Sequence, residues 1–196
     1  LETCVVGLGC GVLTVYGRES DNFDLVEINP AVVEIAKKHF SFMRDCPSNL
    51  THHLGDGRLV LERMTEKKFD LLVLDAFSSD AIPAHMMTYE AVQLFRNRLA
   101  DQGVMAVHVS NTHLNLVPLV HRLCDAAGLT SRTVRSKGDP QRCTSSAIWV
   151  LVTEPENPIW KDELLAESTL PTQSELSGAP FWTDQHHNLV SVLRAW

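Results

Sequence analysis

Two acidic side chains stand close together in the segment 74–83, which reads Leu-Asp-Ala-Phe-Ser-Ser-Asp-Ala-Ile-Pro. Asp75 ends an apolar run, and Asp80 follows five residues later. A protonated amine has a pKa of about 10, so it must lose a proton before its nitrogen can attack as a nucleophile. A pair of carboxylates can hold the cation and accept that proton. The alternative interpretation is that Asp80 caps a following helix or turn, and that Asp75 alone faces a ligand.

A glycine-rich turn ends the first apolar run of the chain. Gly7, Gly9 and Gly11 form a G-x-G-x-G pattern, with Cys10 between the last two. Glycine lets a ligand approach the backbone, and the N-terminus of a following helical run would favour polar or anionic groups. Glu27 lies twenty positions after Gly7, at the end of the next apolar run. A carboxylate there can accept hydrogen bonds from both hydroxyls of a ribose, although a solvated strand end is the alternative.

The pattern of the glycine turn favours a nucleoside without a pyrophosphate. A dinucleotide site would show G-x-G-x-x-G, but the third position after Gly9 is Val12. S-adenosylmethionine or a relative suits the shorter turn. Asp56-Gly57 follows a third candidate strand, where the carboxylate could accept from an adenine amino group, although this dipeptide is more often simply a turn. Asp75 ends a fourth strand, and ligands of α/β proteins bind at such carboxyl ends.

These residues need a sheet to bring them together, and the hydropathy pattern predicts one. Short β-type runs alternate with amphipathic stretches, which indicates an α/β fold with a mostly parallel sheet and helices on both faces. The segment 136–146 is too short for a helical crossover, so one of the last two strands should be antiparallel. The candidate strands are 3–8, 23–28, 50–54, 69–75, 104–110, 131–135 and 147–153. The candidate helices are 30–43, 58–64, 88–99 and 116–127.

Composition excludes several classes of protein. The chain has 196 residues, 44% of them hydrophobic, which suits one sizeable domain. Its net charge is −7, so nucleic acid is not an expected partner. No apolar stretch is long enough to enter a membrane. Five widely spaced cysteines without a C-x-x-C pair indicate reduced thiols, a cytoplasmic location and no metal site. The chain starts without Met in an apolar run, so we expect that a segment has been removed upstream.

The two ends of the sequence differ in composition. Residues 1–155 contain all the candidate motifs, whereas residues 156–196 contain several prolines and isolated aromatic residues among polar ones. We expect residues 1–155 to form the nucleoside-binding domain. Residues 156–196 should form a tail that packs back onto the same domain and ends in a short helix near residues 188–194. Such an aromatic tail could also cover the face of a homodimer.

Taken in order, four motifs resemble those of the spermidine synthase family of aminopropyltransferases. They are the turn 7–11, Val-Glu-Ile-Asn-Pro at 26–30, Gly-Asp-Gly-Arg at 55–58 and the acidic loop 75–83. The bacterial branch whose synthase-like domain is fused to membrane transporter-like helices is still more similar, and the match covers roughly residues 1–155. The resemblance implies a class I methyltransferase-like fold with a seven-stranded sheet and decarboxylated S-adenosylmethionine as the bound nucleoside. It also implies Glu27 on the ribose, Asp56 near the adenine, Asp75 as the base and Asp80 as the holder of the amine.

The sequence departs from that family at four places, one of which is the acidic loop, where Asp75 and Asp80 are further apart than in the family. Cys10 stands where spermidine synthases have an aspartate that holds the cationic end of the nucleoside, and Asn29 replaces an aspartate before the proline. We also expect the N-terminal β-rich region that covers the diamine in the family to be missing, because the glycine turn comes within the first eleven residues given. A methyltransferase that uses S-adenosylmethionine, or a catalytically silent nucleotide-binding domain of a larger protein, are therefore the alternatives to an aminopropyltransferase.

Histidines and serines add little to this interpretation. His108 and His113 flank the end of the fifth candidate strand, and with Asn111 they could line a substrate pocket, although plain hydrogen bonding is the simpler role. The serines in the acidic loop lack the G-x-S-x-G pattern of a nucleophile elbow, so a serine hydrolase is not expected.

Overall fold

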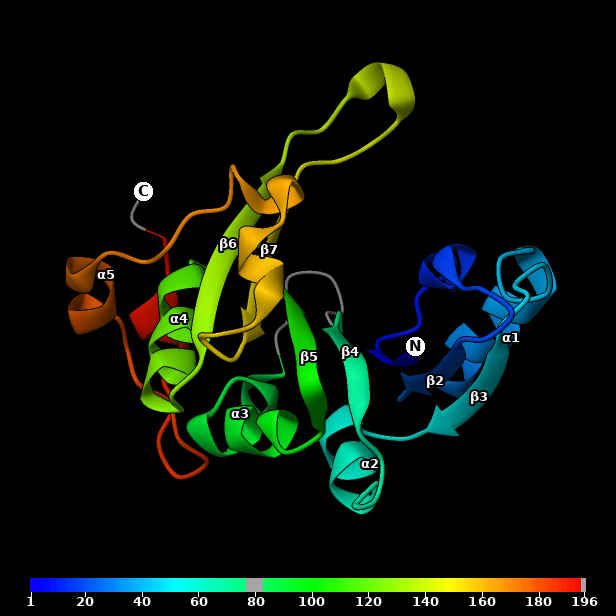
Figure 1. The fold of residues 1–196 in the computed structure, drawn as a ribbon, viewed down its shortest axis with the longest axis horizontal. Coiled ribbons are helices and arrows are strands. Elements are labelled where there is room, and N and C mark those ends of the chain that lie inside the picture. The colour runs from blue at the N-terminus through cyan, green and yellow to red at the C-terminus, as the bar shows by residue number, and fades with distance from the viewer. Residues whose placement is uncertain (77–82, 195–196) are drawn as a thin grey trace.

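Seven strands form one sheet in the order β3-β2-β1-β4-β5-β7-β6. The structure is a computed structural model that describes residues 1–76 and 83–194 (Figure 1). Strand β7 is antiparallel to both of its neighbours, and the other pairs are parallel, which confirms the expected α/β sheet. The strands are β1 (Glu2–Val6), β2 (Asn22–Glu27), β3 (Asn49–Leu54), β4 (Phe69–Leu74), β5 (Leu99–His108), β6 (Thr130–Ser136) and β7 (Ala147–Thr153).

All four expected helices form, and most are bounded by residues that local chemistry favours. The Asn29 side chain accepts from the Ala31 amide, and Pro30 occupies the first turn of α1, where its missing N–H is not needed. The helix ends at His39, before the expected residue 43, because Phe40 is already extended. The helices are α1 (Pro30–His39), α2 (Gly57–Arg63), α3 (Tyr89–Arg96), α4 (Val117–Ala126) and a further short one, α5 (Gln173–Gly178).

The helices pack on both faces of the sheet, and alternate residues of a strand face different cores. In β4, Leu72 and Leu74 belong to a large core with α2, α3 and α4. Val73 belongs to a smaller core with Ala36 of α1. This alternation is the period of two that strand geometry imposes. The core on each face holds the central strands rigidly, so their carboxyl ends have fixed positions.

Two of the expected helical segments form as 3-10 helices. The glycine turn is followed by a five-residue 3-10 helix, η1 (Val12–Tyr16), rather than by an α-helix. β-branched side chains at Val12, Thr14 and Val15 disfavour a helix, and Gly17 returns the chain to an extended conformation. The turn therefore lacks the aligned peptide dipoles of a long helix behind it. The expected short helix near the C-terminus is likewise a 3-10 helix, η6 (Leu189–Val192).

The segment after β7 runs back over the helices that cover the larger core. It contains the 3-10 helices η4 (Pro158–Lys161) and η5 (Glu163–Leu165) as well as α5. Trp182 is 1% exposed and lies inside the larger core, and its carbonyl accepts from the amide of Tyr89 at the start of α3. Phe181 packs on the Tyr89 ring, with the ring centroids 5.4 Å apart. These contacts fix the C-terminal segment to the end of α3.

A long connection between β6 and β7 projects beyond the sheet (Figure 1). It carries one turn of 3-10 helix, η3 (Pro140–Arg142), and is mostly exposed. Across residues 1–76 and 83–194, no helix has the length and apolar character that crossing a membrane requires.

Candidate functional site

Three loops meet at the carboxyl edge of the parallel strands because backbone hydrogen bonding continues past the strand ends. The Gly7 amide donates to the Val26 carbonyl at 2.9 Å, and the Asp75 amide donates to the Val6 carbonyl at 2.8 Å. The loop after β3 joins in the same way through its Gly55 amide. The glycine turn, the end of β2 and the end of β4 are thus neighbours, as the sequence motifs require.

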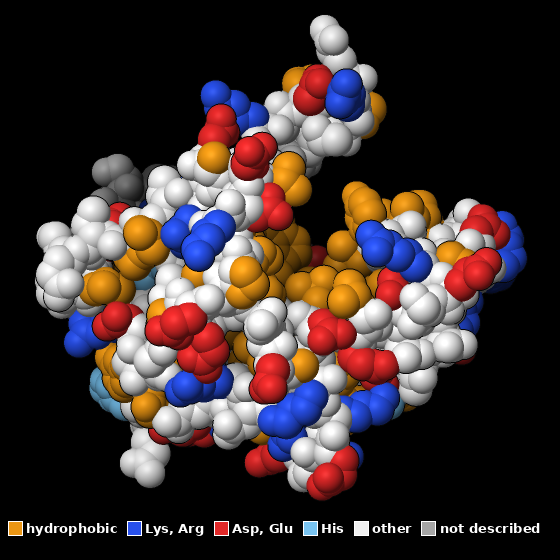
Figure 2. Space-filling model, in the orientation of Figure 1, with side chains coloured by type: hydrophobic (Ala, Val, Ile, Leu, Met, Phe, Trp, Pro, Cys, Tyr) orange, Lys and Arg blue, Asp and Glu red, His pale blue; other side chains and the backbone are white. Residues whose placement is uncertain are grey.

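A cavity of about 560 Å³ lies at this edge. The hollow is visible above the ends of the central strands in Figure 2, with hydrophobic side chains around it. Seven of the nine site residues expected from the sequence line the cavity: Gly7, Gly9, Cys10, Glu27, Asp56, Gly57 and Asp75. Gly11 is not among the lining residues, and Asp80 lies outside the described residues. The fold therefore brings most of the predicted site together.

Gly7 and Gly11 are needed for the backbone conformation of the turn, and Gly7 also lines the cavity. Gly7 has a φ of +98°, and a Cβ there would lie 2.1 Å from the carbonyl oxygen of Asp75. Gly11 has a φ of +83°, and a Cβ would lie 2.8 Å from Cγ of Met43. Left-handed backbone favours glycine, and here the neighbouring atoms exclude any side chain as well. Gly7 allows the first loop to cross directly over the residue expected to act as base.

The Glu27 carboxylate is held between two loops. Its Oε2 accepts from the amide of Leu8 at 3.1 Å, and its Oε1 accepts from the amide of Asn29 at 2.9 Å. Each carboxylate oxygen has two lone pairs, so each can accept a further hydrogen bond from a ligand. The carboxylate is oriented before any ligand arrives, which lowers the entropy lost on binding.

Asp56 has two structural partners that the sequence did not reveal. Its Oδ1 caps α2 by accepting from the Leu59 amide, and its Oδ2 lies 2.8 Å from Nε2 of His85. Burial opposes ionisation, but the hydrogen bonds from Leu59 and His85 outweigh it and hold the pKa of Asp56 below its usual value. The carboxylate is therefore ionised at neutral pH and can still accept from an amino group.

Asp75 is paired with His108 at the end of β5. Its Oδ1 lies 2.6 Å from Nδ1 of His108, and Nε2 of the same ring lies 2.7 Å from Oγ of Ser110. The sequence suggested a pocket or hydrogen-bonding role for this histidine but not its partner. His108 does not line the cavity, whereas Asp75 does.

One wall of the cavity was missed by sequence reasoning. Pro83, His85 and Met86 line it, and the last two belong to the 3-10 helix η2 (Ala84–Met86). The contact between His85 and Asp56 spans 29 residues, and no local pattern indicates it. The Asp56–Gly57 motif could have suggested only that the Asp56 carboxylate would have a hydrogen-bond donor beside it.

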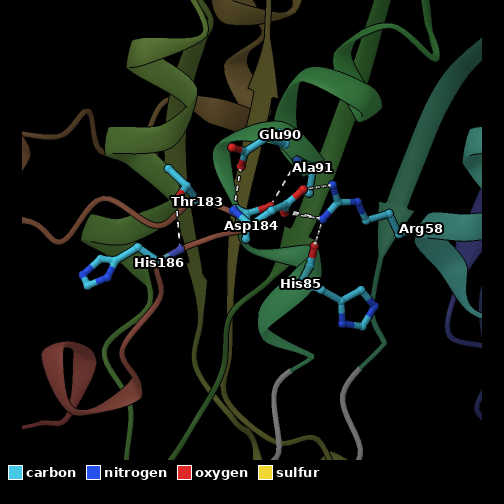
Figure 3. A network of polar contacts seen from close by, with 8 residues as sticks. Arg58, His85, Glu90, Ala91, Thr183, Asp184 and His186 are labelled. Carbon is cyan, nitrogen blue, oxygen red and sulfur yellow. Dashed lines mark hydrogen bonds and ion pairs between the residues drawn. The ribbon is translucent and has the colours of Figure 1, made fainter.

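The C-terminal segment reaches the back of this wall (Figure 3). Arg58 donates to the two carboxylate oxygens of Asp184 at 2.6 and 2.5 Å and to the carbonyl of His85 at 2.8 Å. Thr88 also donates to Asp184, at 2.7 Å, and Glu90 accepts from the Asp184 amide. The hydrogen bonds from Arg58, which has the larger effect, and from Thr88 lower the pKa of Asp184 to about 2. Arg58 thus links the tail to η2.

Several curated proteins are similar to part of the sequence, and two of them represent two kinds of transferase. Over 114 residues, or 55% of this chain, it is 34% identical to a polyamine aminopropyltransferase of Vibrio vulnificus, of which the match covers 37%. Over 112 residues, or 53% of the chain, it is 32% identical to an N-terminal histidine N-methyltransferase of Emericella nidulans, of which the match covers 19%. The similarity therefore spans little more than a third of the length of the first relative. No protein-family model matches the chain.

Solved structures share the fold over almost the whole chain. A probable spermidine synthase of Corynebacterium glutamicum has a TM-score of 0.66 at 17% identity, covering 96% of this chain and 74% of the other. Human methyltransferase-like protein 13, solved with SAH, has a TM-score of 0.61 at 21% identity, covering 90% and 77%. The fold is that of the class I S-adenosylmethionine-dependent methyltransferases and spermidine synthases. At these identities the likeness concerns the fold alone.

Proposed function

We propose that the chain is a transferase domain that binds an S-adenosyl-type nucleoside and transfers an aminopropyl group to an amine. The observation that carries the proposal is the placement of Glu27, Asp56 and Asp75 around one cavity beside the glycine turn. Each follows or ends a neighbouring parallel strand, which is where α/β folds bind ligands. The sequence similarity to a polyamine aminopropyltransferase supports the same choice.

In this proposal the cavity binds decarboxylated S-adenosylmethionine through its walls. Glu27 accepts from the ribose hydroxyls and Asp56 accepts from the adenine amino group. The side chains of Ile28 and Val12 are exposed at the cavity and offer apolar surface to the adenine ring. The volume of about 560 Å³ lies in the usual range for a cofactor pocket.

Asp75 is the proposed base for the transfer. The amine nitrogen attacks the aminopropyl carbon that is bonded to sulfur, and the N–C bond forms as the C–S bond breaks. The electron pair of the broken bond stays on sulfur, giving methylthioadenosine, and the proton of the amine passes to Asp75. Asp80 is proposed to hold the cationic substrate beside it.

A second candidate, methyl transfer from S-adenosylmethionine, is favoured by Cys10. This thiol lines the cavity where an aspartate would hold the ammonium of the decarboxylated nucleoside. Without that charge, the cavity loses an ionic contact that would select the decarboxylated form and repel the carboxylate of S-adenosylmethionine. The partial match to a histidine N-methyltransferase supports this second candidate.

An assay of Asp75→Asn separates the enzymes from a catalytically silent domain. The whole chain is incubated with decarboxylated S-adenosylmethionine or S-adenosylmethionine and a set of short linear diamines, and products are followed by mass spectrometry. We expect aminopropylated diamine from the wild type and a loss of about 10²-fold or more in kcat for the variant. Asp101→Asn, an exposed change on β5, is the matched control and should keep full turnover. Methylated product alone would reject aminopropyl transfer, and a wild type without any product would reject both enzymes.

A further inference from the structure

Three side chains form a row across the end of the sheet. The β4–β5 register pairs Leu74 with Val107, so Asp75 and His108 are the next positions on each chain. The β5–β7 register pairs His108 with Trp149. Paired positions on neighbouring strands point to the same face. The register therefore places the carboxylate, the imidazole and the indole side by side.

Contacts on three sides fix the imidazole of His108. Its ring stacks on Trp149, with the centroids 4.7 Å apart and the planes inclined by 22°. Nδ1 lies 2.6 Å from Oδ1 of Asp75, and Nε2 lies 2.7 Å from Oγ of Ser110. The Ser110 oxygen is itself fixed, because it accepts from the amide of Ile148 at 2.8 Å. Rotating the ring would break both hydrogen bonds and the stack.

The chemistry of the partners assigns the donor on the ring. An ionised Asp75 only accepts, so the proton of this hydrogen bond lies on Nδ1. Ser110 still has its hydroxyl hydrogen after accepting from Ile148, and it can donate to Nε2. Both ring nitrogens then have a hydrogen-bond partner: Nδ1–H donates to Asp75, and Nε2 accepts from Ser110. The remaining Asp75 oxygen, Oδ2, accepts no hydrogen bond from the residues that the structure describes.

We propose that His108 is a positioning residue for the proposed base: its Nδ1–H holds Oδ1 of Asp75 so that Oδ2 receives the proton of the amine. The inference rests on the proposed function of this site. His108 acts through Asp75 because it does not line the cavity that would hold the nucleoside. Ser110 and Trp149 hold the ring in turn. A general base needs supporting contacts of this kind so that its carboxylate keeps its orientation during the reaction.

Two substitutions separate the hydrogen bond from the bulk of the ring. His108→Leu fills similar space but has no donor, whereas the amide nitrogen of His108→Asn can occupy the place of Nδ1. We expect His108→Leu to lower kcat about 10²-fold. The Kd for methylthioadenosine, measured by calorimetry, should change less than about 3-fold, because the nucleoside does not touch His108. His108→Asn should recover kcat to within about 5-fold of the wild type.

The chain offers a matched control in a second histidine–aspartate pair. Nε2 of His53 lies 2.6 Å from Oδ1 of Asp24, the same separation, but neither residue lines the cavity. His53→Leu should leave kcat and Kd unchanged at a temperature at which all the variants are folded. A Leu variant at 108 that keeps its kcat, or an Asn variant as slow as the Leu variant, would overturn the inference.

Crystal structures of the two position-108 variants test the inference without any turnover. We expect the Asp75 carboxylate to leave its position in His108→Leu and to keep it in His108→Asn. An unmoved carboxylate in His108→Leu overturns the positioning role even if the wild type transfers nothing. A moved carboxylate in a protein that shows no transfer supports the positioning role and rejects the proposed function, so the two failures are distinguishable.

Discussion

Arg58 and Asp184 form a bidentate ion pair between residues that are 126 positions apart, with nitrogen–oxygen distances of 2.6 and 2.5 Å. Arg58 follows directly after the Asp56-Gly57 motif at the cavity. It also donates to the carbonyl of His85, whose ring contacts Asp56. The C-terminal segment is therefore connected to a cavity wall through one guanidinium group.

Asp184→Asn should destabilise the protein by about 1 kcal/mol, because it removes a charge-assisted pair whose carboxylate is partly exposed. Urea unfolding at neutral pH measures the free energy of unfolding. Asp45→Asn is the control: its pair with Arg44 lies on the surface, where solvent screens it, so this change should lower the free energy of unfolding much less than Asp184→Asn does. If both substitutions lowered the free energy of unfolding equally, the Arg58–Asp184 pair would stabilise the protein no more than a surface ion pair, which would contradict this prediction.

Buried His121 makes the stability depend on pH. Burial between the hydroxyls of Ser131 and Thr133 lowers its pKa from 6.5 to about 4. As the pH falls below 6.5, the unfolded chain gains a proton that the folded chain does not, so stability falls until the pH reaches about 4. Over this interval the free energy of unfolding falls by an amount on the order of 3 kcal/mol. In urea unfolding, His121→Gln should flatten this part of the curve; an unchanged slope would show that other groups cause it.

Gly7→Ala should disrupt both the fold and the site. The new methyl group would lie 2.1 Å from the carbonyl oxygen of Asp75, so the turn or the end of β4 must move. We expect a loss of about 2 kcal/mol or more in the free energy of unfolding, together with weaker nucleoside binding. Gly178→Ala has open space around it and is the control for stability. A Gly7→Ala protein with wild-type stability would mean that the two loops are not packed as described.

Cys10→Asp should change which nucleoside the cavity prefers. The added carboxylate would attract the ammonium of decarboxylated S-adenosylmethionine and repel the carboxylate of S-adenosylmethionine. We expect the ratio of their affinities, from calorimetry, to shift about 10-fold or more towards the decarboxylated form. Cys10→Asn, which adds similar bulk without charge, should leave the ratio nearly unchanged. The same shift in both variants would assign the effect to size.

The sheet was predictable because each strand carries its own signal. The apolar runs around Val5 and Val73 mark strands locally, and the short gap before residue 147 indicated the antiparallel strand. The motif carboxylates followed from their places at strand ends. Contacts that depend on tertiary packing were not predictable. His85 meets Asp56, and Asp184 meets Arg58, only after distant segments have packed together.

The contact between His108 and Asp75 was predictable only in part. The parallel order of the strands was expected, and a correct β4–β5 register would have placed the two residues side by side. The register itself depends on how the hydrophobic faces pack, and a shift of one residue would have turned His108 to the other face. Sequence reasoning therefore found both residues but not their contact.

Calorimetric titration of the whole chain with four nucleosides tests the central claim most directly. They are decarboxylated S-adenosylmethionine, methylthioadenosine, S-adenosylmethionine and S-adenosylhomocysteine, each titrated into the wild type and into Glu27→Gln. We predict that decarboxylated S-adenosylmethionine and methylthioadenosine bind the wild type, and that Glu27→Gln weakens their binding about 10-fold or more because the ribose loses a charged acceptor. Absence of binding by all four, or equal affinity in the variant, would contradict the assignment of this cavity as a nucleoside site.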